Sequence, residues 1–295
     1  MRDLTGRDKI LYDSVTPAVR FLPLHFGWAA VPQEPRCLVI LVGGAFFGTF
    51  PTFFYRALLQ RLHDRGCAVV ALPFRFSFRH WDIALSLADY QSELRDEIAA
   101  LMPLPATGLP TVWIGHSLGC KYIALIELLS DAEQPRFDAA MEHCLRPTER
   151  LALERRLPDL DLARLSLIDQ PSILLDPVIS DLDNAVPIPP LRRLLERWLR
   201  VWPSRGETFC LVERSRLFQL TSILSFGSSM SRATVEVLEA LPRQPWLERI
   251  NLLGKRHLAV LGLRQIDADI LSGVETLLDH SLPRAVAPAA PPLPR

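Results

Sequence analysis

The chain has 295 residues, of which 49% are hydrophobic and 22% charged, so it can bury a sizeable core and global disorder is excluded. Lys and Arg total 33 and Asp and Glu total 33. This balance argues against a nucleic-acid partner, because phosphate binding needs a basic surface. The 5 cysteines have no CxxC spacing, which predicts reduced thiols, no disulfide framework, no zinc site and a cytoplasmic location. The first ten residues lack the apolar stretch of a secretion signal, which agrees with that location.

From residue 36 onward the sequence alternates between strand-like and helix-like patterns. We expect strands at residues 37–42, 67–73, 111–114, 172–175, 220–226 and 247–253. We expect helices at residues 51–64, 81–102, 118–130, 233–240 and 268–280. The strand segments are short apolar runs, as in parallel strands that are buried on both faces. The alternation therefore predicts an α/β fold with a mostly parallel, doubly wound sheet.

Two stretches interrupt this alternation and are expected to be insertions that form a helical cap over one end of the sheet. They are the charge-rich, helical residues 131–167 and the residues 187–213. We expect a single domain over residues 1–281 and a proline-rich, disordered tail over 282–295. Residues 190–202 place Leu and Trp on one helix face and Arg around it, which favours a helix packed on the domain. A lid or a peripheral membrane contact are the alternatives for this helix.

The sharpest motif lies between an expected strand and an expected helix. Residues 111–121 read TVWIGHSLGCK and contain GxSxG. This arrangement predicts that Ser117 projects from a tight strand-to-helix turn, where glycines two positions away avoid a backbone clash. The backbone N–H of Leu118, at the start of the helix, would then stabilise an oxyanion. Ser117 is therefore the candidate nucleophile of an acyl-transfer reaction.

A second oxyanion donor is expected from the sequence GGAFF, which follows the first expected strand. Ala45 or Gly44 would supply it, and a turn that serves only chain reversal is an equally weighted alternative. Phe46, Phe47 and His116 are expected to line a substrate pocket. Aromatic residues are more often part of a core, and a residue in the position of His116 is usually a packing neighbour of the nucleophile.

A serine nucleophile needs a base and an acid, which follow it in chain order on this fold. His257, after the last expected strand, is the candidate base, and His280 at a helix end is expected to be solvated. The loop after the penultimate strand, residues 227–232, reads GSSMSR and has no carboxylate. Asp176, at the end of the preceding strand, is therefore the candidate acid. Capping of a turn ahead of Pro177 is the alternative role for this residue.

Several motifs together resemble the DUF1350 group of α/β-hydrolase-like proteins from cyanobacteria and plastids. The specific ones are GGAF and GHSLG, and further likeness lies at residues 55–56, 65–73 and 77–78. The likeness covers roughly residues 36–183 and, more thinly, 256–258. It implies an α/β-hydrolase fold. Family members carry an acidic stretch after the penultimate strand, where this chain has GSSMS.

Together these features predict an α/β-hydrolase fold with an inserted helical cap. The predicted function is serine hydrolysis of a carboxylic ester or related acyl substrate by Ser117, His257 and Asp176. The expected partner is a small ester molecule, and neither a cofactor nor a metal ion is required. The oligomeric state is left open. The alternative is a hydrolase fold that has lost its acid and serves as a binding, peripheral membrane or assembly protein.

Overall fold

The computed structural model of the chain describes residues 19–101, 109–130, 135–159, 166–179, 201–215, 218–241 and 247–284. Within these ranges, eight strands form one sheet in the order β1-β2-β4-β3-β5-β6-β7-β8. The strands are β1 (Leu22–Leu24), β2 (Gly27–Ala30), β3 (Cys37–Val42), β4 (Cys67–Leu72), β5 (Thr111–His116), β6 (Ser172–Leu175), β7 (Thr221–Ser225) and β8 (Glu248–Asn251). Neighbouring strands from β4 to β8 along the sheet run parallel, which confirms the predicted doubly wound sheet.

The hairpin formed by β1 and β2 is the part of the sheet that the sequence did not predict. These strands have 3 and 4 residues and pair antiparallel at the edge of the sheet beside β4. Strands this short carry too few residues to show a clear alternation of apolar and polar positions. The other six strands lie where the apolar runs predicted them.

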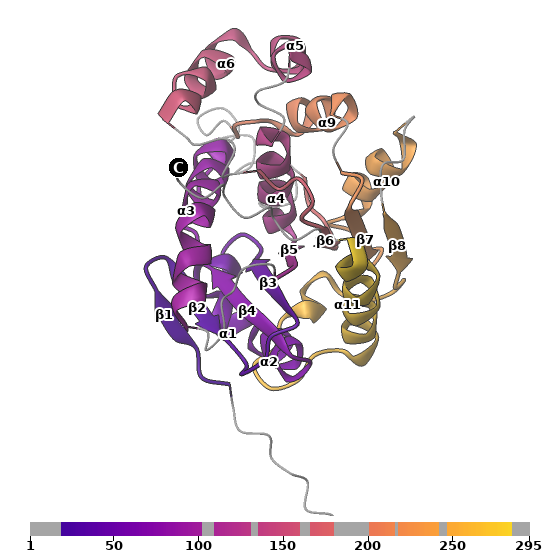
Figure 1. Cartoon of the computed structure of the whole chain (residues 1–295). Coiled ribbons are helices and arrows are strands. Elements are labelled where there is room, and N and C mark those ends of the chain that lie inside the picture. Colours follow the sequence, from indigo (N-terminus) through magenta and orange to yellow (C-terminus); the bar gives the residue numbers. More distant parts are fainter. Residues whose placement is uncertain are drawn as a thin grey trace, which may run out of the picture.

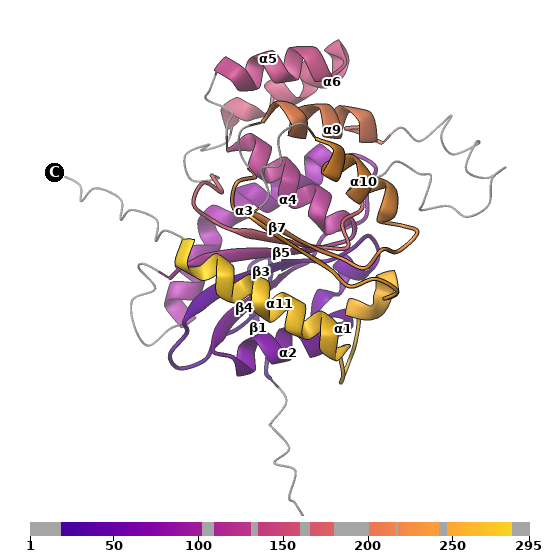
Figure 2. The same ribbon diagram turned by 90° about the vertical axis from the view of Figure 1, so that its right-hand side faces the viewer.

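Helices cover both faces of the sheet (Figure 2). On one face lie α3 (His80–Leu101), α4 (Leu118–Leu129) and α10 (Arg232–Ala240), and on the other lie α2 (Arg56–Asp64) and α11 (Ala268–Ser281). Alternate residues of each central strand therefore point into two separate cores. In β3, for example, Leu38, Ile40 and Val42 pack on the side of α4, while Val39 and Leu41 pack on the side of α11. Burial on both faces explains why the central strands are apolar at successive positions.

The helix expected over residues 51–64 is interrupted at Tyr55. A short α1 (Pro51–Phe54) precedes this residue and α2 follows it. The interruption coincides with backbone pairing to a distant loop, because Gly262 N–H donates to Phe54 O and Ala57 N–H donates to Gly262 O, both at 2.9 Å. This pairing joins the loop after β3 to the loop after β8.

The insertions contribute α5 (Pro135–Cys144), α6 (Pro147–Glu154) and α9 (Arg205–Arg214). Helix α9 packs on α4, and α5 and α6 lie outside α9 (Figures 1 and 2), whereas the sequence predicts the insertions over one end of the sheet. The start of α9 is defined by a reciprocal cap. Glu207 N–H donates to Ser204 Oγ at 3.3 Å, and Ser204 N–H donates to Glu207 Oε2 at 2.8 Å.

Residues 180–200 lie outside the described ranges, and so do residues 285–295. The amphipathic helix predicted over 190–202 therefore falls outside them except for its last two residues, as does most of the tail predicted over 282–295. No helix in the described ranges combines the length and the apolarity needed to cross a membrane.

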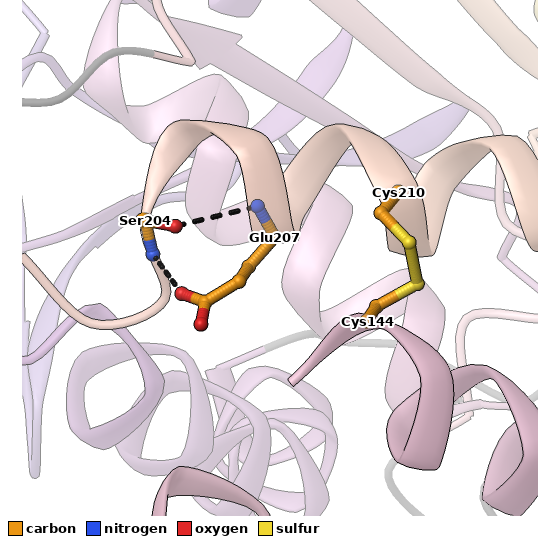
Figure 3. Close-up of a disulfide and its surroundings, with 4 residues drawn as sticks. All are labelled: Cys144, Ser204, Glu207 and Cys210. Atoms are coloured by element: carbon orange, nitrogen blue, oxygen red, sulfur yellow. Dashed lines mark hydrogen bonds between the residues drawn. A yellow bond between two sulfur atoms is a disulfide. The ribbon is translucent and has the colours of Figure 1, made fainter. Parts of the chain in front are cut away.

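A disulfide between Cys144 of α5 and Cys210 of α9 joins the two insertions (Figure 3). The prediction that all five cysteines are reduced is therefore wrong for this pair. The two residues are 66 positions apart, and packing of α5 against α9 brings their Cα atoms to 5.6 Å, within the range that a disulfide requires. The remaining cysteines, Cys37, Cys67 and Cys120, are free and buried.

Candidate active site

Ser117 occupies the sharp turn between β5 and α4. Its φ of 55° and ψ of −121° form a combination that residues other than glycine rarely adopt. The close contact between this turn and β3 explains the glycine two positions later. A Cβ atom at Gly119 would lie 2.2 Å from the carbonyl oxygen of Val42. Any side chain there would push α4 away from the sheet, so the GxSxG spacing has the physical reason that the sequence predicted.

Ser117, His257 and Asp176 lie together at the carboxyl ends of the parallel strands. His257 Nε2 is 2.9 Å from Ser117 Oγ, and His257 Nδ1 is 2.6 Å from Asp176 Oδ2. The histidine begins a short helical turn, His257–Val260, after β8, and the aspartate directly follows β6. None of the three residues is more than 8% exposed. The structure thus brings the three sequence-predicted residues into one chain of hydrogen bonds.

The backbone around Asp176 explains how this residue reaches the site. Ser117 N–H donates to Leu175 O at 3.1 Å, and Asp176 N–H donates to Leu224 O at 2.7 Å. Asp176 has a φ of 43°, in the left-handed region that aspartate tolerates better than most residues. These bonds hold the end of β6 between the turn that carries Ser117 and the end of β7.

Asp176 accepts hydrogen bonds from the loop that follows β7. Its carboxylate accepts from Phe226 N–H at 3.0 Å, from the Ser228 hydroxyl at 2.5 Å and from the Ser231 hydroxyl. Burial by itself would raise the pKa of Asp176. The bonds from His257, Ser228, Ser231 and Phe226 outweigh that effect, so the pKa lies below its ordinary value. The carboxylate is therefore ionised at neutral pH.

Sequence reasoning missed the contribution of Ser228 and Ser231. The sequence of the loop after β7 has no carboxylate, which by itself indicates that the loop contributes nothing to a triad. In the structure the same loop supplies two hydroxyl donors to a carboxylate on the neighbouring strand. Two serines three positions apart, directly after a buried strand, were the available signal.

The expected oxyanion donors do not all remain candidates. Gly44 N–H donates to the Tyr55 hydroxyl at 2.7 Å, so the prediction that Gly44 serves as an oxyanion donor is wrong. The N–H groups of Leu118, in the first turn of α4, and of Ala45 remain. A Cβ at Gly44 would lie 2.9 Å from the Cβ of Ser117, so a glycine is needed for this loop to approach the nucleophile.

His116 does not line a substrate pocket, so that prediction is also wrong. The residue is fully buried, and its Nδ1 accepts from the Tyr55 hydroxyl at 2.8 Å while its Nε2 donates to the His257 carbonyl oxygen at 3.0 Å. This tautomer follows because a carbonyl oxygen only accepts. Burial and the nearby His257 lower the pKa of His116 to about 3, so the ring is neutral. Through Tyr55, which sequence reasoning missed, His116 connects Gly44 to the backbone of His257.

The two phenylalanines predicted to line the pocket are placed differently from one another. Phe46 is exposed next to Ala45, and its ring contacts that of Phe76 at a centroid distance of 4.8 Å. Phe47 is half-buried and packs edge-on against Phe54 at 5.0 Å.

In the described part of the chain, no group of three or more His, Cys, Asp and Glu side chains is arranged to hold a metal ion.

Comparison with solved structures shows that the chain has an α/β-hydrolase fold. A proposed carboxylesterase from Lactobacillus plantarum aligns with a TM-score of 0.56 and 15% identity, over 90% of this chain and 99% of that one. Native esterase 2 from Thermogutta terrifontis aligns with a TM-score of 0.55 and 14% identity, over 93% of this chain and 96% of that one. At such identities the likeness defines the fold.

The family comparison is narrower than the structural one. Residues 23–137 match the model of a family described as protein of unknown function (DUF1350). The match confirms the resemblance inferred from the GGAF and GHSLG motifs over those residues. The likeness expected further along the chain, up to residue 183 and at 256–258, lies beyond it. No curated protein matches the chain.

Proposed function

We propose that the protein is a serine hydrolase that cleaves a carboxylic ester or a related acyl substrate. The observation that carries the proposal is the unbroken chain of hydrogen bonds from Asp176 through His257 to Ser117. A serine hydroxyl is a weak nucleophile, and a histidine that accepts its proton makes it reactive. The left-handed backbone of Ser117 adds support, because strain of this kind concentrates at functional sites.

Ser117, His257 and Asp176 each have a defined role in the proposed reaction. Ser117 Oγ attacks the carbonyl carbon while His257 Nε2 takes the hydroxyl proton and then delivers it to the leaving alcohol. A water molecule, activated by the same nitrogen, hydrolyses the acyl-enzyme and frees Ser117. Asp176 accepts from His257 Nδ1–H throughout and stabilises the imidazolium that forms.

The negative charge that develops on the carbonyl oxygen needs donors close to Ser117. The N–H of Leu118 lies next to the nucleophile at the start of α4, where the helix dipole also favours a negative charge. The N–H of Ala45 would be the second donor, from the loop that Gly44 brings against Ser117. In the part of the chain that the structure describes, no hydrogen bond engages the Ala45 N–H, which leaves it available for an oxyanion.

The proteins of similar fold support an ester as the substrate. Esterase 2 from Thermogutta terrifontis has been described with butyrate bound, and also phosphoramylated by tabun. A carboxylic ester is therefore the substrate we propose for this chain. A cytoplasmic location is not part of the proposal, because the Cys144–Cys210 disulfide is typical of oxidising compartments.

Covalent labelling with a fluorophosphonate probe tests the proposal without knowledge of the natural substrate. We expect one adduct per chain, located at Ser117 by peptide mass spectrometry, and no adduct in Ser117→Ala. Ser86→Ala, on the exposed side of α3, is the matched control and should be labelled like the wild type. Equal labelling of wild type and Ser117→Ala would refute the assignment.

A further inference from the structure

Exposed apolar side chains gather on the two loops that carry the candidate oxyanion donor and the candidate base. The structure describes nine large apolar side chains that are exposed, and six of them lie on the segments after β3 and β8. These six, between 47% and 80% exposed, form what we call the apolar rim: Phe46, Phe50, Phe53, Leu253, Leu258 and Leu263. Scattered apolar residues are normal on a protein surface, but a concentration of this kind indicates an interaction site.

The two loops are joined to one another and to the candidate active site. Gly262 is hydrogen-bonded on both sides to the segment that carries Phe53, through Phe54 O and Ala57 N–H. In sequence, Phe46 directly follows Ala45 and Leu258 directly follows His257. The apolar rim therefore borders the Ser117–His257 pair on both of these loops.

The two loops of the rim differ in charge. Residues 37–55 contain no charged residue, and five of the nine residues from 46 to 54 are phenylalanine. On the other loop, the ammonium group of Lys255 is paired with Asp267 and Asp269, at 2.8 and 2.6 Å, while Arg256 and Arg264 are exposed. The uncharged loop with its exposed rings favours an apolar phase, and the two arginines can keep their charged ends at the polar surface of that phase.

We propose that the apolar rim docks the protein onto the surface of an aggregated ester, such as a lipid droplet or a micelle. Docking would deliver an apolar acyl chain to Ser117 without passage through bulk water. The inference rests on the proposed hydrolase function and specifies its substrate class, namely esters whose chains are long enough to aggregate. We infer an aggregated ester as the binding partner because the rim borders Ser117 and His257. A surface in that place brings whatever it binds next to the nucleophile.

The test compares a monomeric ester with an aggregated one. Wild-type rates are measured on p-nitrophenyl butyrate below its solubility limit and on a triolein emulsion. The rim variant is the double Phe53→Ser/Leu263→Ser, and the control is the double Leu151→Ser/Ile168→Ser, which removes two comparably exposed side chains from other surfaces. We expect the rim variant to lose at least tenfold in rate on the emulsion, with an unchanged rate on the monomeric ester. The control double should match wild type on both substrates.

Binding separates this inference from the proposed function. Flotation with triolein droplets coated with phosphatidylcholine needs no catalysis, so it can be done with the Ser117→Ala variant. We expect this variant to bind the droplets, and we expect binding to be lost when the rim substitutions are added to it. Droplet binding by the rim variant at the wild-type level would overturn the inference, and so would equal loss of both activities. A dimer that forms in solution and is abolished by the rim substitutions would overturn it too. If the wild type hydrolysed neither ester, the hydrolase function would be refuted. Flotation would still show whether the rim binds droplets.

Discussion

Replacing Asp176 by asparagine would test the candidate triad with almost no change in side-chain volume. The structure predicts how the new amide would be oriented. Phe226 N–H only donates and lies 3.0 Å from Asp176 Oδ1, so the amide carbonyl oxygen should occupy that position. The amide NH2 would then take the position of Oδ2, 2.6 Å from His257 Nδ1. The hydroxyls of Ser228 and Ser231 can rotate to donate or to accept, so they do not oppose this orientation.

An NH2 group facing His257 Nδ1 would change the tautomer of the histidine. Nδ1 would have to accept, which leaves the proton on Nε2, the nitrogen that must accept from Ser117 Oγ. In a serine protease the same substitution lowers kcat by about 10⁴. That factor corresponds to about 5.5 kcal/mol of transition-state stabilisation. We expect a loss of similar size here, with little change in KM, because the interaction acts mainly in the transition state.

The assay is kcat and KM on p-nitrophenyl butyrate, together with the rate of fluorophosphonate labelling. Asp169→Asn is the matched control, since Asp169 lies beyond the opposite end of β6, is exposed, and also has a positive φ of 67°. It should keep wild-type kcat. If Asp176→Asn retained kcat within about tenfold of the wild type, the orientation of His257 by this carboxylate would be refuted.

Further predictions concern the groups that support the site and the sheet. Ser228→Ala/Ser231→Ala removes two donors to Asp176 and should cost about 2 kcal/mol per hydroxyl. The folded-state pKa of Asp176 is lowered, so its stabilising effect is present at neutral pH and is lost as the pH falls. Without the two hydroxyls this pKa rises towards the unfolded value, so urea unfolding from pH about 7 to 3 should show a smaller loss in the double variant than in the wild type. Tyr55→Phe leaves Gly44 N–H without its partner and should lower the free energy of unfolding by about 2 kcal/mol, and an unchanged value in urea would contradict this. Burial raises the pKa of Glu127 to about 7, so wild-type stability should fall as the pH rises from about 4 to 7. Glu127→Gln should abolish that slope in thermal melts and stabilise the protein by ~3 kcal/mol at higher pH, whereas a retained slope would assign it to another group.

Local sequence patterns were sufficient for the parts of the fold that depend on local physics. The apolar runs of the parallel strands and the spacing of the helices follow from burial, which acts on each segment separately. The turn at Ser117 was predictable for a similar reason, because the glycines that it requires lie within two positions of the serine. The position of His257 followed from chain order on this fold.

The sequence by itself therefore determined the order along the chain of the six parallel strands, the turn that presents Ser117, and the late histidine as the candidate base. It left Asp176 between two roles, and only the tertiary structure brings that carboxylate to His257. The same is true of Tyr55, of the Ser228 and Ser231 donors, and of the disulfide between the insertions. Each of these depends on contacts between segments that are far apart in the chain, 81 residues in the case of Asp176 and His257. Such contacts arise from how neighbouring strands align their carboxyl ends and how helices pack, and no local pattern encodes them.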